Sequence, residues 1–306
     1  MLTYIMLAGG LHGLFLGGDW LVRGASQIAA RFNVPPLIIG LTIVGFGTST
    51  PELLVSLQAA FDGLPGISIG NVVGSNTANI LLILGVAGII APPIADFLNM
   101  RRDLFWMLGA ALVMPVIIAS GYVGRIEGAA LITGLIIYLG LSCRAMRNDP
   151  TEALPSDVNL LHAAGFTIAG LIAVMVGAKY LVESATIIAR HLGVSEAMIG
   201  LSIVAIGTSL PELATTVAAA IKGEREIALG NIIGSNIFNI LAILGLTGLI
   251  IPIPVDTRFM SFDVPVMICA TLLILGLIYV RGEISRIAGG LMILAYIGYI
   301  AIGASL

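Results

Sequence analysis

The chain repeats one pattern of polar residues at a fixed spacing within otherwise apolar sequence. The stretch Gly-Thr-Ser-Thr-Pro-Glu-Leu at 47–53 recurs at 207–213 as Gly-Thr-Ser-Leu-Pro-Glu-Leu. Gly-Asn-Val-Val-Gly-Ser-Asn at 70–76 recurs at 230–236 as Gly-Asn-Ile-Ile-Gly-Ser-Asn. Without a gap, more than two thirds of the positions in 39–53 and in 70–85 are identical to their partners. Unrelated apolar helices would not agree at polar positions, so the two halves are copies of one unit.

Ten apolar segments alternate with short polar connections. Hydrophobic residues make up 58% of the chain, charged residues 10%, and the mean hydropathy is +1.08. Soluble domains carry about 25% charged residues, so the excess apolar surface must face lipid. We predict an all-α polytopic membrane protein with ten transmembrane helices, because a span needs roughly 20 apolar residues. The predicted spans are 2–22, 36–60, 67–91, 104–120, 126–144, 160–182, 196–220, 227–251, 261–280 and 287–305.

The basic residues are distributed unevenly between the connections. Odd-numbered connections hold 10 of the 14 and even-numbered connections hold 4. We predict an integral protein of the cell (inner) membrane. Cytoplasmic loops are enriched in Lys and Arg, so both termini are predicted to lie on the outer side of this membrane. Five spans per half is an odd number, so the second copy must enter the membrane from the opposite side. We predict two inverted-topology five-helix repeats, 1–144 and 160–306, a short cytoplasmic linker at 145–159, and ion-binding motifs at 39–85 and 199–245.

This layout narrows the class of function. Inverted-topology repeats are typical of secondary transporters, whose substrate sites lie near the bilayer midplane where the repeats meet. The net charge of −3 leaves no basic stripe for nucleic acid. Cys143 and Cys269 lie in apolar runs, which argues against a disulfide framework or a zinc site. We expect a monomer in the lipid bilayer, with no enzymatic activity and no cofactor.

Glu52 and Glu212 are the ionisable residues of the repeated motif, deep within predicted spans. A charge at such depth costs about 2.5–3.5 kcal/mol or more, so it indicates a functional site. Pro51 and Pro211 have no N–H group and should break each helix just before the glutamate. The break leaves the carbonyl four residues earlier without its helical donor, and that oxygen then needs a partner or lines a cavity.

Helical spacing places further oxygen atoms beside each glutamate. Thr48 and Ser49 lie four and three residues before Glu52 and share its face. Asn71, Ser75 and Asn79 form a polar stripe along the next span, and the second half repeats both patterns. Neither motif contains His or Cys, which favours a hard cation over zinc or copper. Two carboxylates can neutralise one Ca²⁺, two Na⁺ or two H⁺, as an antiporter requires. The glycines at 70, 74, 230 and 234 are predicted to let the third span of each half approach the second closely.

At the paired Gly-Thr-Ser-x-Pro-Glu and Gly-Asn-x-x-Gly-Ser-Asn-x-x-Asn motifs the chain resembles the calcium/cation antiporter superfamily. The resemblance is to its sodium/calcium exchanger branch in the short prokaryotic form, and it extends over the ten-span layout. It implies that spans 1 and 6 slide across a rigid core, for which Gly9, Gly10, Gly13, Gly17 and Gly18 suit a smooth face. It also implies metal ligands from both halves, with backbone carbonyls near Gly45 and Ala205 completing Na⁺ positions: Thr48, Ser49, Glu52, Ser75, Asn79, Thr208, Ser209, Glu212, Ser235 and Asn239.

The sequence leaves the coupling ion open. The leading hypothesis is exchange of Ca²⁺ for Na⁺ by alternating access, and its nearest rival is Ca²⁺/H⁺ antiport on the same two glutamates. A passive cation channel, more often built from a ring of acidic residues around an axis, is a third possibility. A membrane scaffold without transport is a fourth. The resemblance implies Asp at the position of Asn239 in some family members, a pattern similar to that of potassium-dependent exchangers. The Asn in this chain argues against K⁺ co-transport.

Overall fold

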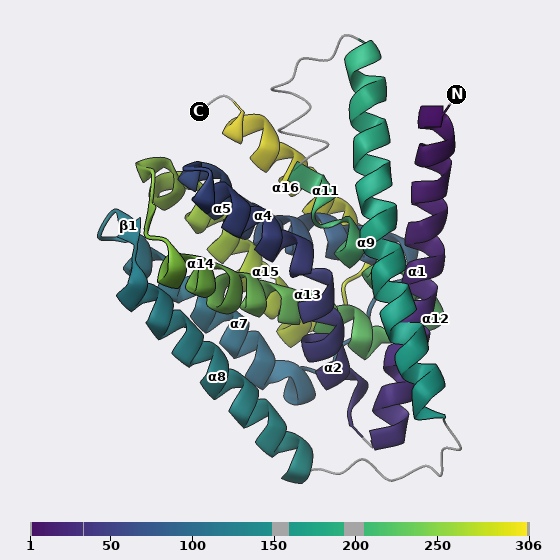
Figure 1. Ribbon diagram of the computed structural model, residues 1–306. Coiled ribbons are helices and arrows are strands. Elements are labelled where there is room, and N and C mark those ends of the chain that lie inside the picture. The colour runs from purple at the N-terminus through teal and green to yellow at the C-terminus, as the bar shows by residue number, and fades with distance from the viewer. Residues whose placement is uncertain (1, 33, 149–158, 193–204, 305–306) are drawn as a thin grey trace.

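The computed structural model describes residues 2–32, 34–148, 159–192 and 205–304, and the described chain is almost wholly helical (Figure 1). Helices labelled η are π-helical turns. The first half contains α1 (Leu2–Phe32), α2 (Pro36–Ile39), η1 (Gly40–Val44), α3 (Gly45–Thr48), α4 (Thr50–Phe61), α5 (Pro65–Ala78), η2 (Asn79–Ile83), α6 (Leu84–Ile90), α7 (Phe97–Ile118), β1 (Tyr122–Val123) and α8 (Arg125–Asn148). The second contains α9 (Leu160–His191), α11 (Ala205–Gly207), α12 (Leu210–Lys222), α13 (Arg225–Phe238), η4 (Asn239–Leu244), α14 (Gly245–Ile250), β2 (Ile253–Pro254), η5 (Phe259–Asp263), α15 (Val264–Arg281) and α16 (Arg286–Gly303).

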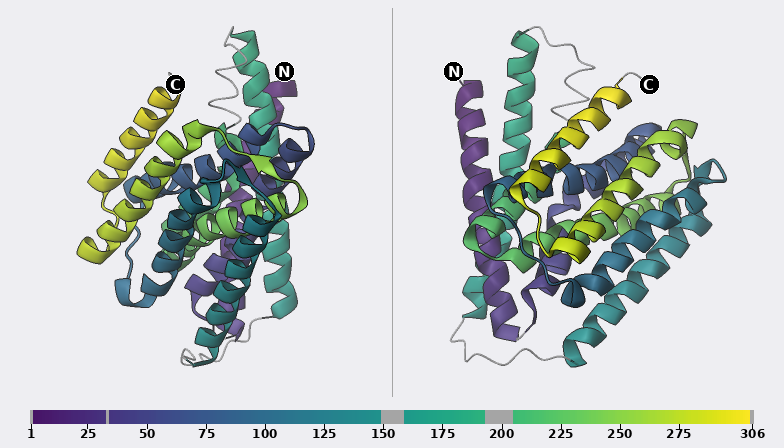
Figure 2. Two further views of the ribbon diagram at one scale, coloured as in Figure 1. Left: turned by 90° about the vertical axis from the view of Figure 1, so that its left-hand side faces the viewer. Right: turned by 180° about the vertical axis from the view of Figure 1, so that it is seen from behind.

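Seven described helices are long and apolar enough to cross a membrane, and an eighth span is added if the pair 36–48 and 50–61, bent by 41°, is counted as one. Helix α7 lies outside this set, and it carries three charged residues in succession from Arg101 to Asp103. The seventh predicted span, 196–220, starts outside the described residues, as does most of the predicted linker. Ten spans therefore stay a prediction. Helix α1 begins and α16 ends toward the same end of the molecule (Figure 2).

The expectation of a purely helical chain needs one small correction. Strands β1 and β2 pair antiparallel, with Tyr122 opposite Pro254 and Val123 opposite Ile253. An isolated bridge between Ile94 and Glu283 is the repeat counterpart of this pairing, because Ile94 corresponds to Pro254 and Glu283 to Val123. Each strand contributes two residues. Pairing between the two connections provides partners for backbone N–H and C=O groups that lie outside the helices. Span prediction from hydropathy does not detect contacts of this length.

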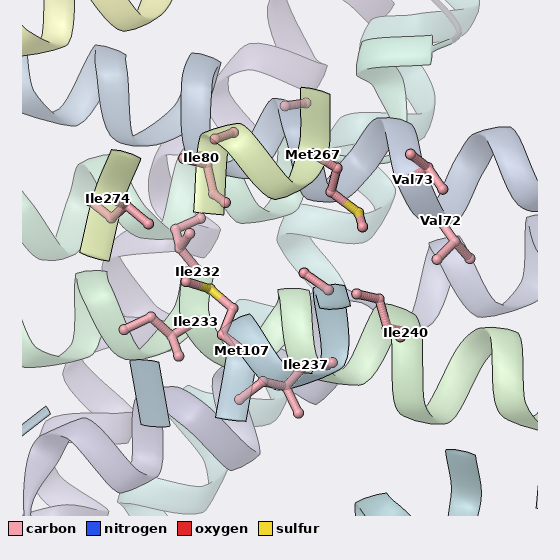
Figure 3. Close-up of a cluster of buried hydrophobic side chains, with 14 of the residues drawn as sticks. Val72, Val73, Ile80, Met107, Ile232, Ile233, Ile237, Ile240, Met267 and Ile274 are labelled. Carbon is pink, nitrogen blue, oxygen red and sulfur yellow. The ribbon is translucent and has the colours of Figure 1, made fainter. Parts of the chain in front are cut away.

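The centre of the molecule is formed by the third span of each half. The span 225–250 has 94% of its most apolar window buried inside the protein, against 22% for α16. Figure 3 shows the buried cluster between these helices, with Val72 and Val73 from α5 and Ile232 and Ile233 from α13. Large apolar side chains on α8, α9 and α16 point outward instead, among them Ile126, Leu161 and Ile287. The central helices are enclosed by protein and the peripheral helices present apolar surface to lipid.

Helices α1 and α9 run side by side, apart from the more inclined remainder (Figures 1 and 2). Their backbones touch at glycines. A Cβ atom at Gly10 would lie 2.8 Å from the carbonyl oxygen of Gly177, and one at Gly17 would lie 2.7 Å from the backbone nitrogen of Val174. The predicted sliding face therefore needs correction, because Gly10, Gly13 and Gly17 pack against α9, and only Gly18 meets the core, at Ala214 of α12. Close packing of small residues joins the two helices to each other.

Both helices extend beyond their predicted spans. With 31 residues, α1 is about 46 Å long, well above the roughly 30 Å of hydrocarbon that a span must cross. The prediction ended the span at residue 22 because Arg23 follows. In the structure the Arg23 guanidinium lies 4.7 Å from the centroid of the Phe166 ring of α9. Arginine is a good helix former, and the contact with the ring adds a favourable cation–π interaction.

A buried acid in each peripheral helix pair was missed by sequence reasoning. Asp263 accepts a hydrogen bond from the Tyr299 hydroxyl at 2.8 Å and lies 3.4 Å from the Arg258 guanidinium. Asp103, its counterpart in the first half, is 1% exposed and pairs with Arg102 at 2.9 Å. Both acids occur at equivalent positions of the repeat, so the gapless alignment contained the signal. Each carboxylate is neutralised locally, far along the chain from the glutamate motifs.

Substituting Tyr299 by Phe is expected to lower stability without abolishing transport. Loss of the hydroxyl leaves a buried carboxylate with one donor fewer, which costs about 1–3 kcal/mol. The melting midpoint of the detergent-purified protein, followed by size-exclusion chromatography after heating, should fall by a few degrees. Tyr279→Phe is the matched control because that side chain is 68% exposed. Equal midpoints for the two variants would show that the bond to Asp263 does not contribute.

Candidate cation site

A break in the helix positions each glutamate of the repeat. The helical path ends at Thr48, Ser49 adopts φ −83° and ψ 5°, and α4 starts again with Pro51 in its first turn. Ser209 has nearly the same conformation, φ −90° and ψ 6°, before α12. Proline suits the first turn of a helix, where its missing N–H needs no partner. The predicted proline breaks are confirmed, and backbone N–H groups of the first break bond to the carbonyls of Gly45 and Gly47.

The two glutamates lie in the first turns of α4 and α12 and contact serines of the opposite half. Ser49 Oγ donates to Glu212 Oε1 at 3.1 Å, and Ser209 Oγ donates to Glu52 Oε1 at 3.4 Å. Exposed fractions are 1% for Glu52 and 0% for Glu212. Helix N-termini carry partial positive charge and so favour carboxylates. Reciprocal contacts between equivalent residues of the two halves place both motifs around one shared centre.

An asparagine from each half holds this centre together. Asn71 Nδ2 donates to the Glu52 carbonyl at 2.9 Å and to Ser56 Oγ at 2.8 Å. Its amide oxygen lies 3.4 Å from Thr208 Oγ1 of the other half. Asn231 makes the equivalent contacts to the Glu212 carbonyl, to Thr216 Oγ1 and to Thr48 Oγ1, the last at 3.1 Å. Each motif helix is thus tied both to its own half and to the opposite one.

A second asparagine network crosses the centre. Asn79 Nδ2 donates to Asn236 Oδ1 at 3.0 Å, and Asn239 Nδ2 donates to Asn76 Oδ1 at 2.9 Å. The Asn76 and Asn236 amides reach each other's backbone carbonyls at 3.2 and 3.4 Å. These two residues belong to the repeated motif but were not among the predicted ligands. Their bonds fix the orientation of Asn79 and Asn239. The amide nitrogens of these two residues donate hydrogen bonds, and their amide oxygens accept none among the described residues.

Four buried oxygens of this centre accept no hydrogen bond among the described residues: Glu52 Oε2, Glu212 Oε2, Asn79 Oδ1 and Asn239 Oδ1. They form two symmetric pairs, and each belongs to a side chain whose other polar atom is bonded. A buried polar group without a partner is costly, so two symmetric pairs of them require an explanation. Carboxylate and amide oxygens are the ligands that hard cations prefer. The set contains no nitrogen or sulfur donor, so it fits Ca²⁺ or Na⁺ better than a transition metal.

The other predicted ligands differ in their hydrogen bonds and in their burial. The Gly45 carbonyl accepts from Ser235 Oγ at 3.2 Å and from the Ser49 backbone N–H at 3.1 Å, so it already has donors. Ser75 is buried in α5 at the position equivalent to Ser235. Ala205 is the first residue of α11. Thr208 is only partly buried, whereas its counterpart Thr48 is fully enclosed.

Three of the four motif glycines pack against the opposite half, and a Cβ atom at the fourth, Gly74, would meet nothing within 4 Å. A Cβ atom at Gly230 would lie 2.6 Å from the Leu37 carbonyl oxygen, and one at Gly234 would lie 2.7 Å from Leu41 Cα. These glycines therefore bring α13 against α2 and η1 of the first half, which corrects the expectation that each would approach the second span of its own half. Gly70 meets the Phe259 ring at 3.6 Å instead. The spacing of glycines along one span does not show which half supplies the helix that packs against them.

Comparison with known proteins identifies the family. The sequence profile of the sodium/calcium exchanger protein family matches residues 2–144 and 162–303. The chain belongs to the sodium/calcium exchanger family. The sodium/calcium exchanger MaX1 of Methanosarcina acetivorans is 35% identical over 342 residues, and the putative antiporter CaxA of Alkalimonas amylolytica is 39% identical over 311 residues. Each alignment covers 98% of both chains.

Solved structures of the exchanger family share the fold. A structure of the sodium-calcium exchanger NCX_Mj, soaked with 2.5 mM Na⁺ and 0.1 mM Ca²⁺, matches with a TM-score of 0.86 at 37% identity over 98% of both chains. The exchanger resemblance predicted from the repeated motifs is thus confirmed, as is the short prokaryotic form. The chain is an integral membrane protein of a family that transports Na⁺ and Ca²⁺ as substrates.

Proposed function

We propose that the chain exchanges Ca²⁺ for Na⁺ across the cell membrane by alternating access, at a site centred on Glu52 and Glu212. The observation that carries this proposal is the set of four buried oxygens without hydrogen-bond donors, two from glutamates and two from asparagines. Ca²⁺ takes six to eight oxygen ligands, and two carboxylates balance its charge. The other proposed ligands are the hydroxyl groups of both motifs and the backbone carbonyls near Gly45 and Ala205. The hydroxyls belong to Thr48, Ser49, Ser75, Thr208, Ser209 and Ser235.

Charge balance supports exchange rather than one-way passage. A site that holds two carboxylates and no cation carries two buried negative charges, which are expensive to keep in a low-dielectric interior. Filling it with one Ca²⁺ or with two Na⁺ removes that net charge. The filled site can therefore change the side that it faces more readily than the empty one. This requirement couples the movement of one ion to the return of the other.

The proposed arrangement in the membrane follows from the repeat. Ten spans form two inverted five-helix repeats, 1–144 and 160–306, with both termini outside and the linker 145–159 in the cytoplasm. Reciprocal hydrogen bonds such as Ser49 to Glu212 and Ser209 to Glu52 are what a twofold relation between the halves would produce. The twofold axis then lies in the membrane plane, with the glutamates close to it. One chain contains the whole site, so a monomer suffices.

Proteoliposomes loaded with Na⁺ and diluted into Na⁺-free buffer test the function. The proposal predicts uptake of radiolabelled Ca²⁺ that depends on the outward Na⁺ gradient and stops when a Na⁺ ionophore dissipates it. A pH gradient applied without Na⁺ is the matched control. Uptake driven by the pH gradient alone would assign H⁺ as the coupling ion. Ca²⁺ flux without any counter-ion would indicate a channel and contradict exchange.

A further inference from the structure

One ion pair joins α1 to the end of α12. Lys222 Nζ lies 2.6 Å from Asp19 Oδ1 and donates to the Asp19 carbonyl at 2.8 Å. The Lys222 and Asp19 side chains are 29% and 43% exposed, so the pair lies near the boundary between protein and surroundings. Lys222 is the last residue of α12, which starts beside Glu212. The pair therefore links a peripheral helix to a helix that carries a site glutamate.

The repeat contains the same pair with its charges exchanged. Asp19 corresponds to Lys179 of α9, and Lys222 corresponds to Asp62, which directly follows α4. In the structure this second pair is not formed. Asp62 accepts from Gln58 Nε2 at 2.9 and 3.0 Å, and Lys179 lies 3.9 Å from Glu183 with 71% of its side chain exposed. One of two equivalent contacts is made and the other is open.

The helices around the two pairs are asymmetric in the same sense. Helix α1 packs along α12, and a Cβ atom at Gly18 would lie 2.9 Å from the Ala214 carbonyl oxygen. Helix α9 has no comparable packing against α4, although both helices are described in full. Closure at one contact and separation at its counterpart is the asymmetry that a site facing one side only would require.

An apolar cavity lies beside the closed pair. Leu210, Leu213, Val217 and Ile221 lie on one face of α12, and they line a cavity of about 380 Å³ that α1 and α6 also border. Asp19 and Lys222 lie at the wall of this cavity. A hydrated cation cannot cross such an apolar lining while α1 stays in place. The ion pair thus joins α1 to α12 at the wall of this cavity, on the helix that carries Glu212 in its first turn.

We propose that Asp19–Lys222 and Asp62–Lys179 are alternating latches, and that the first closes one side of the membrane while the second is open. The inference rests on the proposed exchange by alternating access. In the opposite-facing state α9 closes on α4, Asp62 pairs with Lys179, and Asp19 leaves Lys222. Exchanging the signs between the halves also restricts each latch to its own partner, because Asp19 would repel Asp62 and Lys179 would repel Lys222. In the proposed membrane orientation, the closed latch faces the cytoplasm.

Cysteine cross-linking distinguishes the two latches. The native thiols of Cys143 and Cys269 are free and exposed, so both are first replaced by Ser. Asp19→Cys with Lys222→Cys reports one latch, and Asp62→Cys with Lys179→Cys reports the other. Each pair joins residues from different halves, so a protease site introduced into the linker separates the halves on a denaturing gel unless they are cross-linked. A short bismaleimide applied to membranes then measures the fraction closed at each latch.

The charge variants test the mechanism. Asp19→Asn or Lys222→Gln, introduced into the 62/179 reporter, should raise its cross-linked fraction at least threefold, and Arg125→Gln should leave it unchanged. Combining Asp19→Lys with Lys222→Asp should restore the parental fraction, which a loss of packing alone would not do. The latch idea is overturned if the single variants leave the 62/179 fraction unchanged, or if both reporters cross-link fully under the same conditions.

Transport by the cysteine-free parent separates the two proposals. If this parent exchanges Ca²⁺ for Na⁺ but the 62/179 reporter never cross-links, the latches are wrong and the exchanger function stands. If the 62/179 reporter responds to the Asp19 and Lys222 variants as predicted but no Na⁺-driven Ca²⁺ uptake occurs, the latches stand and the transported ions must be reassigned.

Discussion

Replacing Glu212 by Gln is expected to abolish Ca²⁺ uptake, and replacing Glu52 should have the same effect. Two unit charges about 4 Å apart attract by about 4 kcal/mol at an effective dielectric constant of about 20, and Ca²⁺ carries twice that charge. Each 1.4 kcal/mol corresponds to about tenfold in affinity, so loss of one carboxylate should reduce Na⁺-driven uptake by more than roughly 100-fold. The measurement is initial radiolabelled Ca²⁺ uptake into Na⁺-loaded proteoliposomes at matched protein density.

Because the two glutamates make equivalent contacts, the prediction requires that each single substitution abolishes uptake. Each glutamate accepts from a serine of the opposite half and has one oxygen without a donor, so neither should be dispensable. Glu224→Gln is the control, since that side chain stands at the start of α13 without a capping hydrogen bond. Uptake that survives in either site variant, with elution and melting behaviour like the parent, would show that the pair does not form the transport site.

Substituting Gly234 by Val should disrupt the protein itself. A Cβ atom at this position would approach the Leu41 backbone, with Leu41 Cα at 2.7 Å, and a backbone in a helix cannot move aside as a side chain can. Overpacking in a core costs about 1–3 kcal/mol or more, and here the displaced element is η1, next to Gly45 and Thr48 of the site. We expect a melting midpoint at least several degrees lower, together with loss of Ca²⁺ uptake.

Gly140→Val provides the matched control for that substitution. A Cβ atom at Gly140 in α8 would meet nothing within 4 Å, so the same added volume has room. Its melting midpoint and uptake should resemble those of the parent. If Gly234→Val behaved like Gly140→Val, the close approach of α13 to η1 would not exist in the membrane.

The sequence pattern is sufficient to predict the motif residues and the helix breaks. It is insufficient to predict which residues of the opposite half these motifs contact. The proline breaks lie where they are predicted. Spacing along one helix predicts Thr48, Ser49 and Glu52 on one face, which is wrong because the break at Ser49 places Glu52 in a new helix. Spacing could not show that Ser49 bonds to Glu212 rather than to Glu52, because that contact depends on how the halves pack. For the same reason Asn76 and Asn236, which orient the asparagines of the site, were visible in the motif but had no role assigned.

Helix ends and peripheral polar groups were harder to predict for different physical reasons. The predicted first span ends before Arg23, whereas α1 continues through Arg23, whose guanidinium lies over the Phe166 ring of α9. The acids of the peripheral helices match under the gapless alignment of the halves, but their tyrosine surroundings do not. Tyr299 follows Asp263 at a spacing one residue longer than the spacing at which Tyr138 follows Asp103. The gapless comparison therefore reveals the two acids but not the tyrosine partner of Asp263.

The glycine contact between α1 and α9 has a consequence for ion leakage. At Gly10 and Gly177 the backbones of the two helices touch, and such close packing favours joint movement of the pair. If the two helices move as one rigid lever, α1 leaves α12 only as α9 approaches α4. No stage of such a movement opens the site to both sides at once. The Na⁺ gradient would then be protected from dissipation by a backbone contact, far from any residue that binds an ion.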